Sequence, residues 1–336
     1  MRKEEIWCEY QNYIDQPPVQ PRTLFTEACQ SDEITINSWR KTWEANVRTN
    51  NEKFGPFASK SLGELFGKAH QKPVIIAGAG PSLKNAKDSL KDRQDITLVS
   101  CLHNFHFLED NGTPADFYVT LDAGEVTIEE VSEGGQKSSD EYWSITRDRT
   151  LLAYIGTSPR LLEKWQGKVL FFSAPVPDQD FMKFCDDIEV FNVYVSNGGN
   201  VLGACLYIAK AFLGASSIAF IGADFCFSYD KKFHAWNSKY DAKLGNVLRV
   251  KDVFGNSVFT WKSYHNFKGW FEWVSMTVPG AYYNCSEGGT LGAYLEGNIR
   301  SIIQLPLKDY IRQMTMYKEI EAQCLDPKIS ERKLLF

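Results

Sequence analysis

The stretch Val74-Ile-Ile-Ala-Gly-Ala-Gly-Pro-Ser-Leu83 decides the expected fold. Its first four residues form a short apolar run that is typical of a buried strand, and Gly78-Ala-Gly80 marks a turn directly after it. Pro81 suits the first turn of a helix, and Ser82 offers a hydroxyl and an N–H at the positive end of that helix. The stretch therefore predicts a strand, a glycine turn and a helix in immediate succession.

The same alternation of strand and helix continues downstream. Helices are expected at 83–91, 103–111 and 199–212, and further apolar runs predict strands at 96–100, 117–121, 151–155, 169–172 and 217–222. Short β-rich runs joined by helices imply an α/β fold with a doubly wound, mostly parallel Rossmann-like sheet. We assign this domain to residues 71–306.

The two flanks of this domain are expected to be helical. Residues 1–70 form a helical N-terminal extension, in which 34–51 and 62–70 are the predicted helices and Asn37 or Ser38 is the expected N-cap of the first. Residues 307–336 are expected to form a C-terminal helix and tail. The first N-terminal helix carries apolar residues at helical spacing, namely Ile36, Trp39, Trp43 and Val47.

Composition narrows the class of protein. The 336 residues carry a formal net charge of −5, which argues against general binding to nucleic acid or to an anionic membrane. The eight cysteines include no C-x-x-C pair, and the charged start Met1-Arg-Lys-Glu-Glu does not resemble a signal peptide, so a reducing cytoplasm is expected. The apolar stretch 201–227 is interrupted by Lys210 and Gly214, and no transmembrane segment is predicted.

The glycine turn fits a nucleotide, although a plain tight turn explains it as well. Gly78 and Gly80 remove side chains where a phosphate or ribose approaches the backbone. The spacing is not G-x-G-x-x-G, and no acidic residue follows at the distance that grips a nicotinamide ribose, so NAD is not expected. A Walker loop is excluded because G-K-[ST] is missing.

Three later segments extend the pattern. They are Pro114-Ala-Asp-Phe-Tyr-Val-Thr-Leu-Asp122; Ser196-Asn-Gly-Gly-Asn200 through Ile221-Gly-Ala-Asp224, with His234 after it; and Asn284-Cys-Ser-Glu-Gly-Gly289, followed by Leu295-Glu-Gly297. With the glycine turn they resemble, in order and over about residues 43–310, the motifs of the motility accessory factor family, bacterial proteins that glycosylate flagellin. They also resemble the archaeal hydroxymethylpterin diphosphokinases that share this core domain, and the bacterial lipooligosaccharide sialyltransferases, whose G-x-G-P-S-L loop binds a CMP-sugar.

The resemblance implies a nucleotide-dependent transferase. The favoured form is a glycosyltransferase that moves a nonulosonic acid of the sialic or pseudaminic type from a CMP-sugar donor to a protein or glycan hydroxyl. His234 would be the general base and Asp224 a second catalytic residue, and this transfer requires no cofactor. The expected nucleotide-binding residues are Gly78, Gly80, Pro81, Ser82, Leu83, Asn104, Asp122, Ser196, Asn197, Gly198, Glu287 and Gly288.

Each candidate also has a structural explanation. Asp122 and Asp224 end strands at the edge where open α/β sheets bind ligands, but Asp122 also fits a helix cap. Ser196 or Asn197 fits the N-cap of the helix that follows. The aromatic run from Tyr264 to Trp273 fits either a core helix or a surface on which a sugar stacks.

Two other functions stay open on the sequence. One is a diphosphokinase that moves pyrophosphate from ATP to a hydroxymethylpterin-like substrate; it would need Mg²⁺, for which Asp122 and Asp224 are the available carboxylates. The other is a nucleotide-binding protein without catalysis. The expected partners are a nucleotide-sugar donor and an acceptor, and an oligomer is compatible with the sequence.

Overall fold

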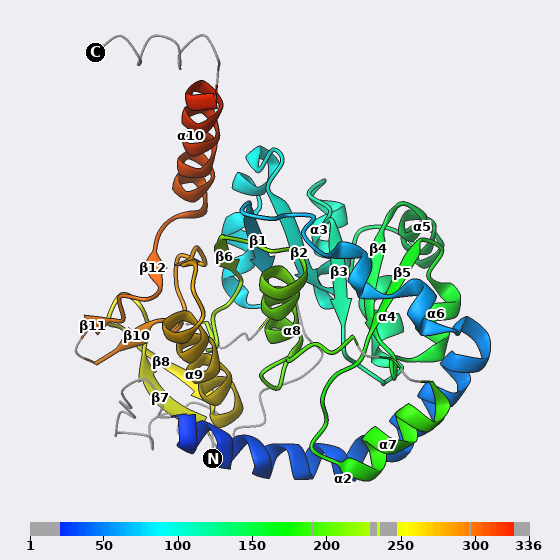
Figure 1. The fold of residues 1–336 in the computed structure, drawn as a ribbon. Helices are drawn as coiled ribbons and strands as arrows, with labels where there is room; N and C mark the ends of the chain where they lie inside the picture. The colour runs from blue at the N-terminus through cyan, green and yellow to red at the C-terminus, as the bar shows by residue number, and fades with distance from the viewer. Residues whose placement is uncertain are drawn as a thin grey trace.

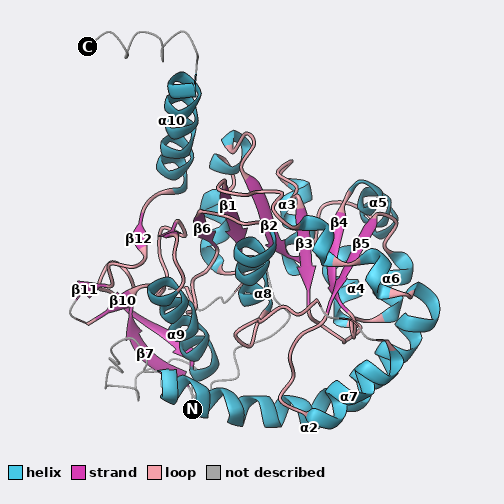
Figure 2. Ribbon diagram, viewed as in Figure 1, coloured by secondary structure: helices cyan, strands magenta, loops and turns pink. Residues whose placement is uncertain are grey.

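An eight-stranded sheet forms the centre of the molecule (Figures 1 and 2). The computed structural model describes residues 21–189, 191, 193–228, 234–235, 247–295 and 297–325, with the side chains of 21–32 and 319–325 excepted. The strand order is β12-β9-β6-β1-β2-β3-β4-β5, and every neighbouring pair is parallel. The strands are β1 Pro73–Ala77, β2 Thr97–Cys101, β3 Phe117–Thr120, β4 Thr150–Tyr154, β5 Lys168–Phe172, β6 Ser217–Ile221, β9 Ala281–Asn284 and β12 Ile303–Gln304.

The predicted strands and the α/β fold class are confirmed. Strand β6 is buried over its whole length and β1 over all but its first residue. Helices cover both faces of such a sheet, so its inner strands read as continuous apolar runs rather than alternating ones. This is why strands β1 to β6 were recognisable in the sequence.

The order of the strands reverses between β1 and β6. From β1 the chain adds β2, β3, β4 and β5 in one direction, and β6 then pairs with the other side of β1. The loops that leave the carboxyl ends of β1 and β6 therefore start side by side at the point where the strand order reverses. In open α/β sheets the crevice at such a switch point is where ligands bind.

The helices differ from the prediction at several ends. Helix α2 spans Pro21–Phe54, so Ser38 lies inside it, where its hydroxyl donates to the Ile34 carbonyl at 2.9 Å instead of capping the helix. The predicted helix at 62–70 is only a 3₁₀ turn, Leu62–Leu65. The segment after the glycine turn forms two 3₁₀ helices, Pro81–Ala86 and Ser89–Asp92. The stretch is rich in Asn, Asp and Ser, which have low helix propensity.

The predicted cap of the long buried helix is also wrong. Helix α8 spans Val201–Tyr207 and continues as a π turn, Ile208–Phe212. Its N-cap is Asn200, whose Oδ1 accepts from the Gly203 amide at 2.9 Å, rather than Ser196 or Asn197. Gly198 and Gly199 have φ values of 56° and 88°, and this left-handed turn delays the start of the helix.

The remaining elements surround the sheet. Helix α8 packs on β1, β2 and β3, and the start of α10 packs on β6. Two hairpins, β7 with β8 and β10 with β11, stand apart from the central sheet. The elements are α3 Phe105–Asp110, α4 Val126–Ser132, α5 Ser139–Ile145, α6 Pro159–Lys164, α7 Gln179–Ile188, β7 Val247–Lys251, β8 Ser257–Trp261, α9 Lys262–Thr277, β10 Ala293–Tyr294, β11 Gly297–Asn298 and α10 Leu307–Leu325, with 3₁₀ helices Phe57–Lys60, Leu102–Asn104 and Thr146–Asp148.

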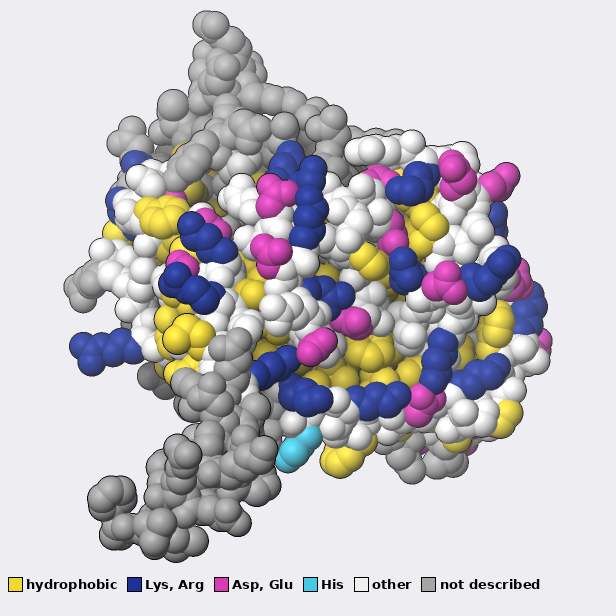
Figure 3. Space-filling view, turned by 90° about the horizontal axis from the view of Figure 1, so that it is seen from above, with side chains coloured by type: hydrophobic (Ala, Val, Ile, Leu, Met, Phe, Trp, Pro, Cys, Tyr) yellow, Lys and Arg dark blue, Asp and Glu magenta, His cyan; other side chains and the backbone are white. Residues whose placement is uncertain are grey.

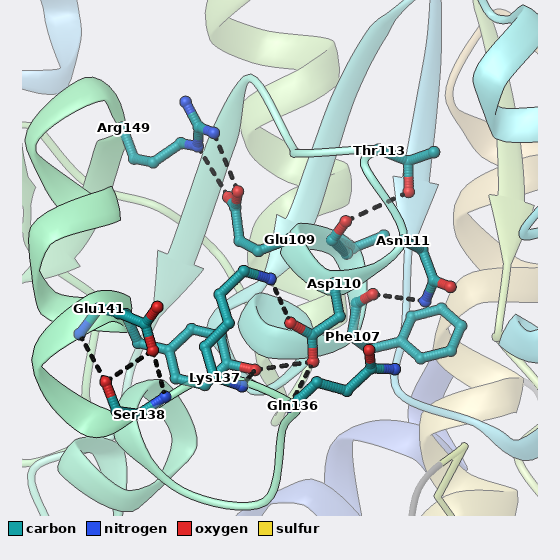
Figure 4. Close-up of polar contacts among 12 residues, drawn as sticks. Phe107, Glu109, Asp110, Asn111, Thr113, Gln136, Lys137, Ser138, Glu141 and Arg149 are labelled. Carbon is teal, nitrogen blue, oxygen red and sulfur yellow. Dashed lines mark hydrogen bonds and ion pairs between the residues drawn. The ribbon is translucent and has the colours of Figure 1, made fainter.

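A polar network fixes α3 to the segment before α5 (Figure 4). The Asp110 carboxylate accepts from the Lys137 ammonium at 2.5 Å, the Gln136 amide at 2.8 Å and the Tyr142 hydroxyl at 2.7 Å. Next to it, Glu109 forms a two-pronged ion pair with Arg149, at 2.7 and 2.9 Å. Because α3 continues directly from the short helix that carries His103 and Asn104, this network also holds that helix in place.

Helix α2 is joined to the carboxyl edge of the sheet, beneath which it passes in the view of Figure 1. The Asn46 side-chain amide donates to the Ala123 and Gly156 carbonyls at 3.0 Å each. One turn later, the buried Asn50 amide donates to the Ile155 and Thr157 carbonyls at 2.8 Å each. These bonds satisfy backbone groups of the loops that follow β3 and β4. At the other end of the contact, Arg40 pairs with Asp178 at 2.8 Å, before α7.

Among the described helices, none is both long and apolar enough to cross a membrane. On the face shown in Figure 3, Lys and Arg side chains are interspersed with Asp and Glu. That arrangement agrees with the small negative net charge of the sequence.

Candidate functional site

The loops after β1 and β6 pack directly against each other at the switch point. The Gly78 amide donates to the Ile221 carbonyl and the Gly80 amide to the Gly222 carbonyl, both at 2.8 Å. A Cβ atom on Gly78 would lie 2.5 Å from the Gly222 oxygen, and one on Gly80 would lie 2.6 Å from the same oxygen and nearer still to Asp224 Oδ2. Both glycines are thus required by the contact between the two loops, independently of any ligand.

A buried carboxylate ties the two loops together. Asp224 Oδ2 accepts from the Ser82 hydroxyl at 2.8 Å and from the Ser82 amide at 3.2 Å. Asp224 is only 7% exposed, and its burial raises the pKa of the carboxyl to about 6 although the hydrogen bonds from Ser82 act in the opposite direction. Its apolar surroundings were expected from the sequence; its role as the joint to Ser82 was not.

The loop after β9 completes this group. The Ser286 hydroxyl accepts from the Ala223 amide at 3.1 Å, and the Thr290 amide donates to the Asp224 carbonyl at 2.7 Å. Between them, Glu287 adopts a left-handed φ of 55° and its side chain is exposed, while Gly288 is partly exposed. Three of the predicted segments, from the loops after β1, β6 and β9, therefore lie next to one another.

The Asn104 side chain binds the backbone of the glycine turn. Its side-chain amide donates to the Ala77 and Gly78 carbonyls at 3.1 Å each and to the Ser100 hydroxyl at 3.0 Å. The residue is fully buried, and its Oδ1 has no hydrogen-bond partner among the described atoms. Asn104 thus supports the expected nucleotide loop through the backbone carbonyls of that loop.

Two histidines meet beside the same turn. The Ala235 amide donates to the Ala79 carbonyl at 3.0 Å, which places the adjacent His234 at the glycine turn. The ring centroids of His234 and His103 are 4.4 Å apart, and His103 Nδ1 lies 2.9 Å from a Glu130 carboxylate oxygen. The contact of His103 with the predicted base places His103 in the candidate site.

The pKa of His234 lies well below the near-neutral value that suits a general base at physiological pH. Burial first, and the neighbouring His103 second, lower the pKa of His234 to about 3. The imidazole is therefore neutral at physiological pH, the form that accepts a proton, but in this environment it is a weak base. A bound anionic group would raise its pKa by favouring the imidazolium.

Asp122 lies on the other side of the histidine pair. Its side chain remains exposed to solvent, yet the surrounding protein raises the pKa of its carboxyl to about 6. Desolvation is the main cause, Glu130 adds to it by repulsion, and His103 counteracts it. Asp122, Glu130, His103 and His234 thus form one cluster of interacting titratable groups at the carboxyl ends of β2 and β3.

The two carboxylates considered for Mg²⁺ do not converge. Asp224 follows β6 and Asp122 follows β3, with β1 and β2 between them. At a strand spacing of about 4.8 Å this separates the two strand ends by roughly 14 Å, whereas Mg²⁺ holds its oxygen ligands at about 2.1 Å. Among the described residues, no group of three or more His, Cys, Asp or Glu side chains is placed to hold a metal ion. The donor set therefore does not fit an ion shared by Asp122 and Asp224.

A large cavity opens beside Asp122, between α2, α9 and the loops after β3 and β5. Its volume is about 830 Å³. Ser196, Asn197 and Gly198 line this cavity, not the contact between the loops after β1 and β6. A Cβ on Gly198 would overlap the Trp270 ring. The predicted nucleotide-binding residues are thus divided between the switch point and the cavity.

The sequence indicated the α9 wall of this cavity, as a possible sugar-stacking surface, but it gave no sign of the α2 wall. Trp39 and Trp43 come from α2, and Phe267, Trp270 and Trp273 come from α9. The helical spacing of apolar residues on α2 does not by itself distinguish packing on the domain from the wall of a cavity. The aromatic run on α9 contributes to both the cavity and the core, because Phe267, Trp270 and Trp273 line the cavity while Phe271 is buried.

Comparison with known proteins places the chain among transferase-like folds. A family model described as 6-hydroxymethylpterin diphosphokinase MptE-like matches residues 46–230, more than half of the chain. Among solved structures, the MAf glycosyltransferase from Magnetospirillum magneticum AMB-1 is similar, with 16% sequence identity and a TM-score of 0.50. That similarity covers 75% of this chain but only 38% of the glycosyltransferase chain, and it shows a shared fold. A search of the curated proteins gives no significant match.

Proposed function

Because the chain belongs to the 6-hydroxymethylpterin diphosphokinase MptE-like family, we propose that it is a nucleotide-dependent transferase, and specifically a glycosyltransferase. Its donor is a CMP-activated nonulosonic acid of the sialic or pseudaminic type, and its acceptor is a hydroxyl of a protein or glycan. The fold shared with the MAf glycosyltransferase supports this choice, as do the four ordered sequence motifs.

One observation carries the proposal. The glycine turn Gly78–Ser82 and Asp224 meet at the switch point of the parallel sheet, with the histidine pair beside them. This is the position at which open α/β sheets hold a nucleotide. The Gly78, Gly80 and Ser82 amides are bonded within this joint, so the donor would contact the outer face of the turn and the histidine pair beside it.

The proposed chemistry is a single displacement. An acceptor hydroxyl transfers its proton to the neutral His234 and bonds to the anomeric carbon as the bond from that carbon to the phosphate oxygen breaks. CMP leaves with the bonding electrons, and the configuration at the carbon inverts. The anionic donor next to His234 raises the basicity of the imidazole, and Asp224 holds the Ser82 turn in position. This scheme does not include a metal ion.

The second candidate is an ATP-dependent diphosphokinase, which the description of the family model favours. It would act on a hydroxymethylpterin-like substrate and would need Mg²⁺. Since Asp122 and Asp224 do not share an ion, that ion would be held by one carboxylate together with the substrate phosphates. A third possibility is a nucleotide-binding protein that has no catalytic activity.

An assay of CMP release distinguishes these functions. The protein is incubated with a CMP-nonulosonic acid, and CMP is quantified with and without EDTA, for the wild type, His234→Ala and His70→Ala. We expect release without added metal and a loss of about 10²-fold or more in His234→Ala, since general bases contribute about that factor. His70 is exposed and precedes the amino end of β1, at the edge of the sheet opposite the site, so His70→Ala serves as the control. Unchanged release in His234→Ala would exclude catalysis through that residue, and activity only with ATP and Mg²⁺ would contradict the glycosyltransferase.

A further inference from the structure

The aromatic cavity next to the histidine pair has walls of an unusual composition. Trp39 and Trp43 of α2 and Phe267, Trp270 and Trp273 of α9 all line it, and each of these side chains is at least partly exposed. Large aromatic surface left in contact with solvent forgoes about 25 cal/mol per Å² of the stabilisation that burial would give. A ligand that covers these rings recovers that free energy.

The rings are held in place before any ligand binds. A Cβ on Gly124 would lie 3.3 Å from the Trp39 ring, and the left-handed turn at Gly198 lies directly against Trp270. Trp43 packs on Phe181 of α7, with ring centroids 5.7 Å apart. The asparagine side chains of α2 also bind the loops after β3 and β4. The wall that α2 forms is therefore fixed to the sheet as well as to α7. Such preorganisation lowers the entropic cost of binding.

The polar groups of the cavity are almost all uncharged. Amides and hydroxyls come from Thr35, Ser196, Asn197, Asn200, Ser263 and Asn266. Of the described residues that line it, Asp122 alone is charged, and none is Lys or Arg. A phosphate or a sugar acid would find no cation among these described residues and would be repelled by Asp122. A neutral ligand rich in hydroxyls finds both acceptors and donors.

The size and position of the cavity indicate where such a ligand acts. A volume of about 830 Å³ exceeds the needs of one sugar ring and falls in the range of about 300–1,000 Å³ typical of ligand pockets. Asp122 interacts electrostatically with His103, whose ring contacts His234. A hydroxyl that hydrogen-bonds to Asp122 therefore lies on the side of the cavity that faces the proposed base.

We propose that this cavity binds the uncharged end of an oligosaccharide, which stacks its C–H faces on the tryptophans and presents a hydroxyl to the histidine pair. Pyranose rings expose an apolar C–H face and a hydroxyl rim, and the cavity supplies aromatic rings for the first and amides for the second. The acceptor is then a neutral glycan and not a protein side chain. This assignment of the acceptor rests on the proposed function, whereas the binding of saccharide does not.

Saturation-transfer NMR on the whole chain tests the proposal. The neutral probes are lactose, N-acetyllactosamine, maltotriose and N,N′-diacetylchitobiose; the comparison probes are sialyllactose and 6-hydroxymethylpterin. We expect transfer to the C–H protons of at least one neutral saccharide, and none to the pterin. Trp39→Ala and the conservative Trp270→Phe should each weaken binding about fivefold or more, while Phe66→Ala, at an aromatic that is 78% exposed outside the cavity, should not.

The outcomes separate this proposal from the proposed function, because CMP binding is measured on the same samples. Saccharide binding that is lost in the tryptophan variants, with CMP binding retained, supports both. Saccharide binding without CMP binding supports the cavity as a sugar site and contradicts the nucleotide assignment. Binding of none of the neutral saccharides by a protein that binds CMP overturns the cavity proposal alone, and so does binding of the pterin at the tryptophans.

Discussion

Substituting Gly80 by alanine probes the contact between the two loops at the switch point. The backbone of Gly80 has φ −64° and ψ 160°, a conformation that alanine adopts freely. In open space the substitution would therefore stabilise the protein by about 0.4–1 kcal/mol, because alanine restricts the unfolded chain. The structure predicts the opposite sign, since the new Cβ would lie 2.6 Å from the Gly222 oxygen and nearer still to Asp224 Oδ2.

The size of the loss follows from what must move. If the Asp224 side chain turns away, it loses its bonds from Ser82, and a hydrogen bond to a charged group contributes about 1.5–3 kcal/mol. If the Gly222 carbonyl moves, the bond from the Gly80 amide is lost and the two loops separate. Overpacking of this kind costs about 1–3 kcal/mol. Together we expect the free energy of unfolding to fall by about 2–4 kcal/mol in Gly80→Ala.

Urea unfolding measures this loss, and the neighbouring loop offers a matched control. A Cβ on Gly288 would meet no atom within 4 Å, so Gly288→Ala should remain within about 0.5 kcal/mol of the wild type. The expected result is a lower midpoint for Gly80→Ala with an unchanged slope. If Gly80→Ala were as stable as the wild type, or more so, the loops would not be in the contact described.

Three further variants test separate parts of the site. The pKa of Asp224 is raised in the folded state, so between about pH 4 and 6 the folded protein keeps a proton that the unfolded chain releases. The free energy of unfolding therefore falls by up to about 3 kcal/mol as the pH rises through that window. Urea unfolding should show a shallower fall in Asp224→Asn, and an identical fall would be inconsistent with this pKa. Asn50→Ala should cost about 2–4 kcal/mol, because two buried carbonyls lose their donor; a loss below 1 kcal/mol would argue against the asparagine contact. His103→Gln should raise the pKa of His234 in an NMR titration, since His103 helps to lower it; no change would show that the rings do not interact.

The sheet was predictable because burial on both faces leaves a direct trace in the sequence. The runs that form β1 to β6 are apolar, short and bounded by turn residues, so each strand could be located along the chain without knowledge of distant contacts. The helix ends were less predictable. The start of α8 is set by the left-handed turn at Gly198 and Gly199, and the sequence shows glycine there but not its φ.

The candidate site was predictable only in part, because the sequence does not show which of its residues contact each other in the folded protein. The sequence singled out Asp224 and Ser82 separately, but their hydrogen bond joins residues 142 positions apart. The pairing of His103 with His234 has the same origin. The aromatic cavity is built from segments between Thr35 and Trp273, and periodicity alone gives no reason to bring α2 against α9.

The central claim is that the switch point holds a cytidine nucleotide, and a thermal-shift titration tests it most directly. A ligand that binds only the folded state at a hundred times its dissociation constant stabilises it by about 2.7 kcal/mol. CMP, CDP, ATP and ATP with Mg²⁺ are titrated separately into the wild-type protein. We predict that CMP raises the melting temperature equally with and without EDTA. Stabilisation by ATP that requires Mg²⁺, with no effect of CMP, would contradict the claim.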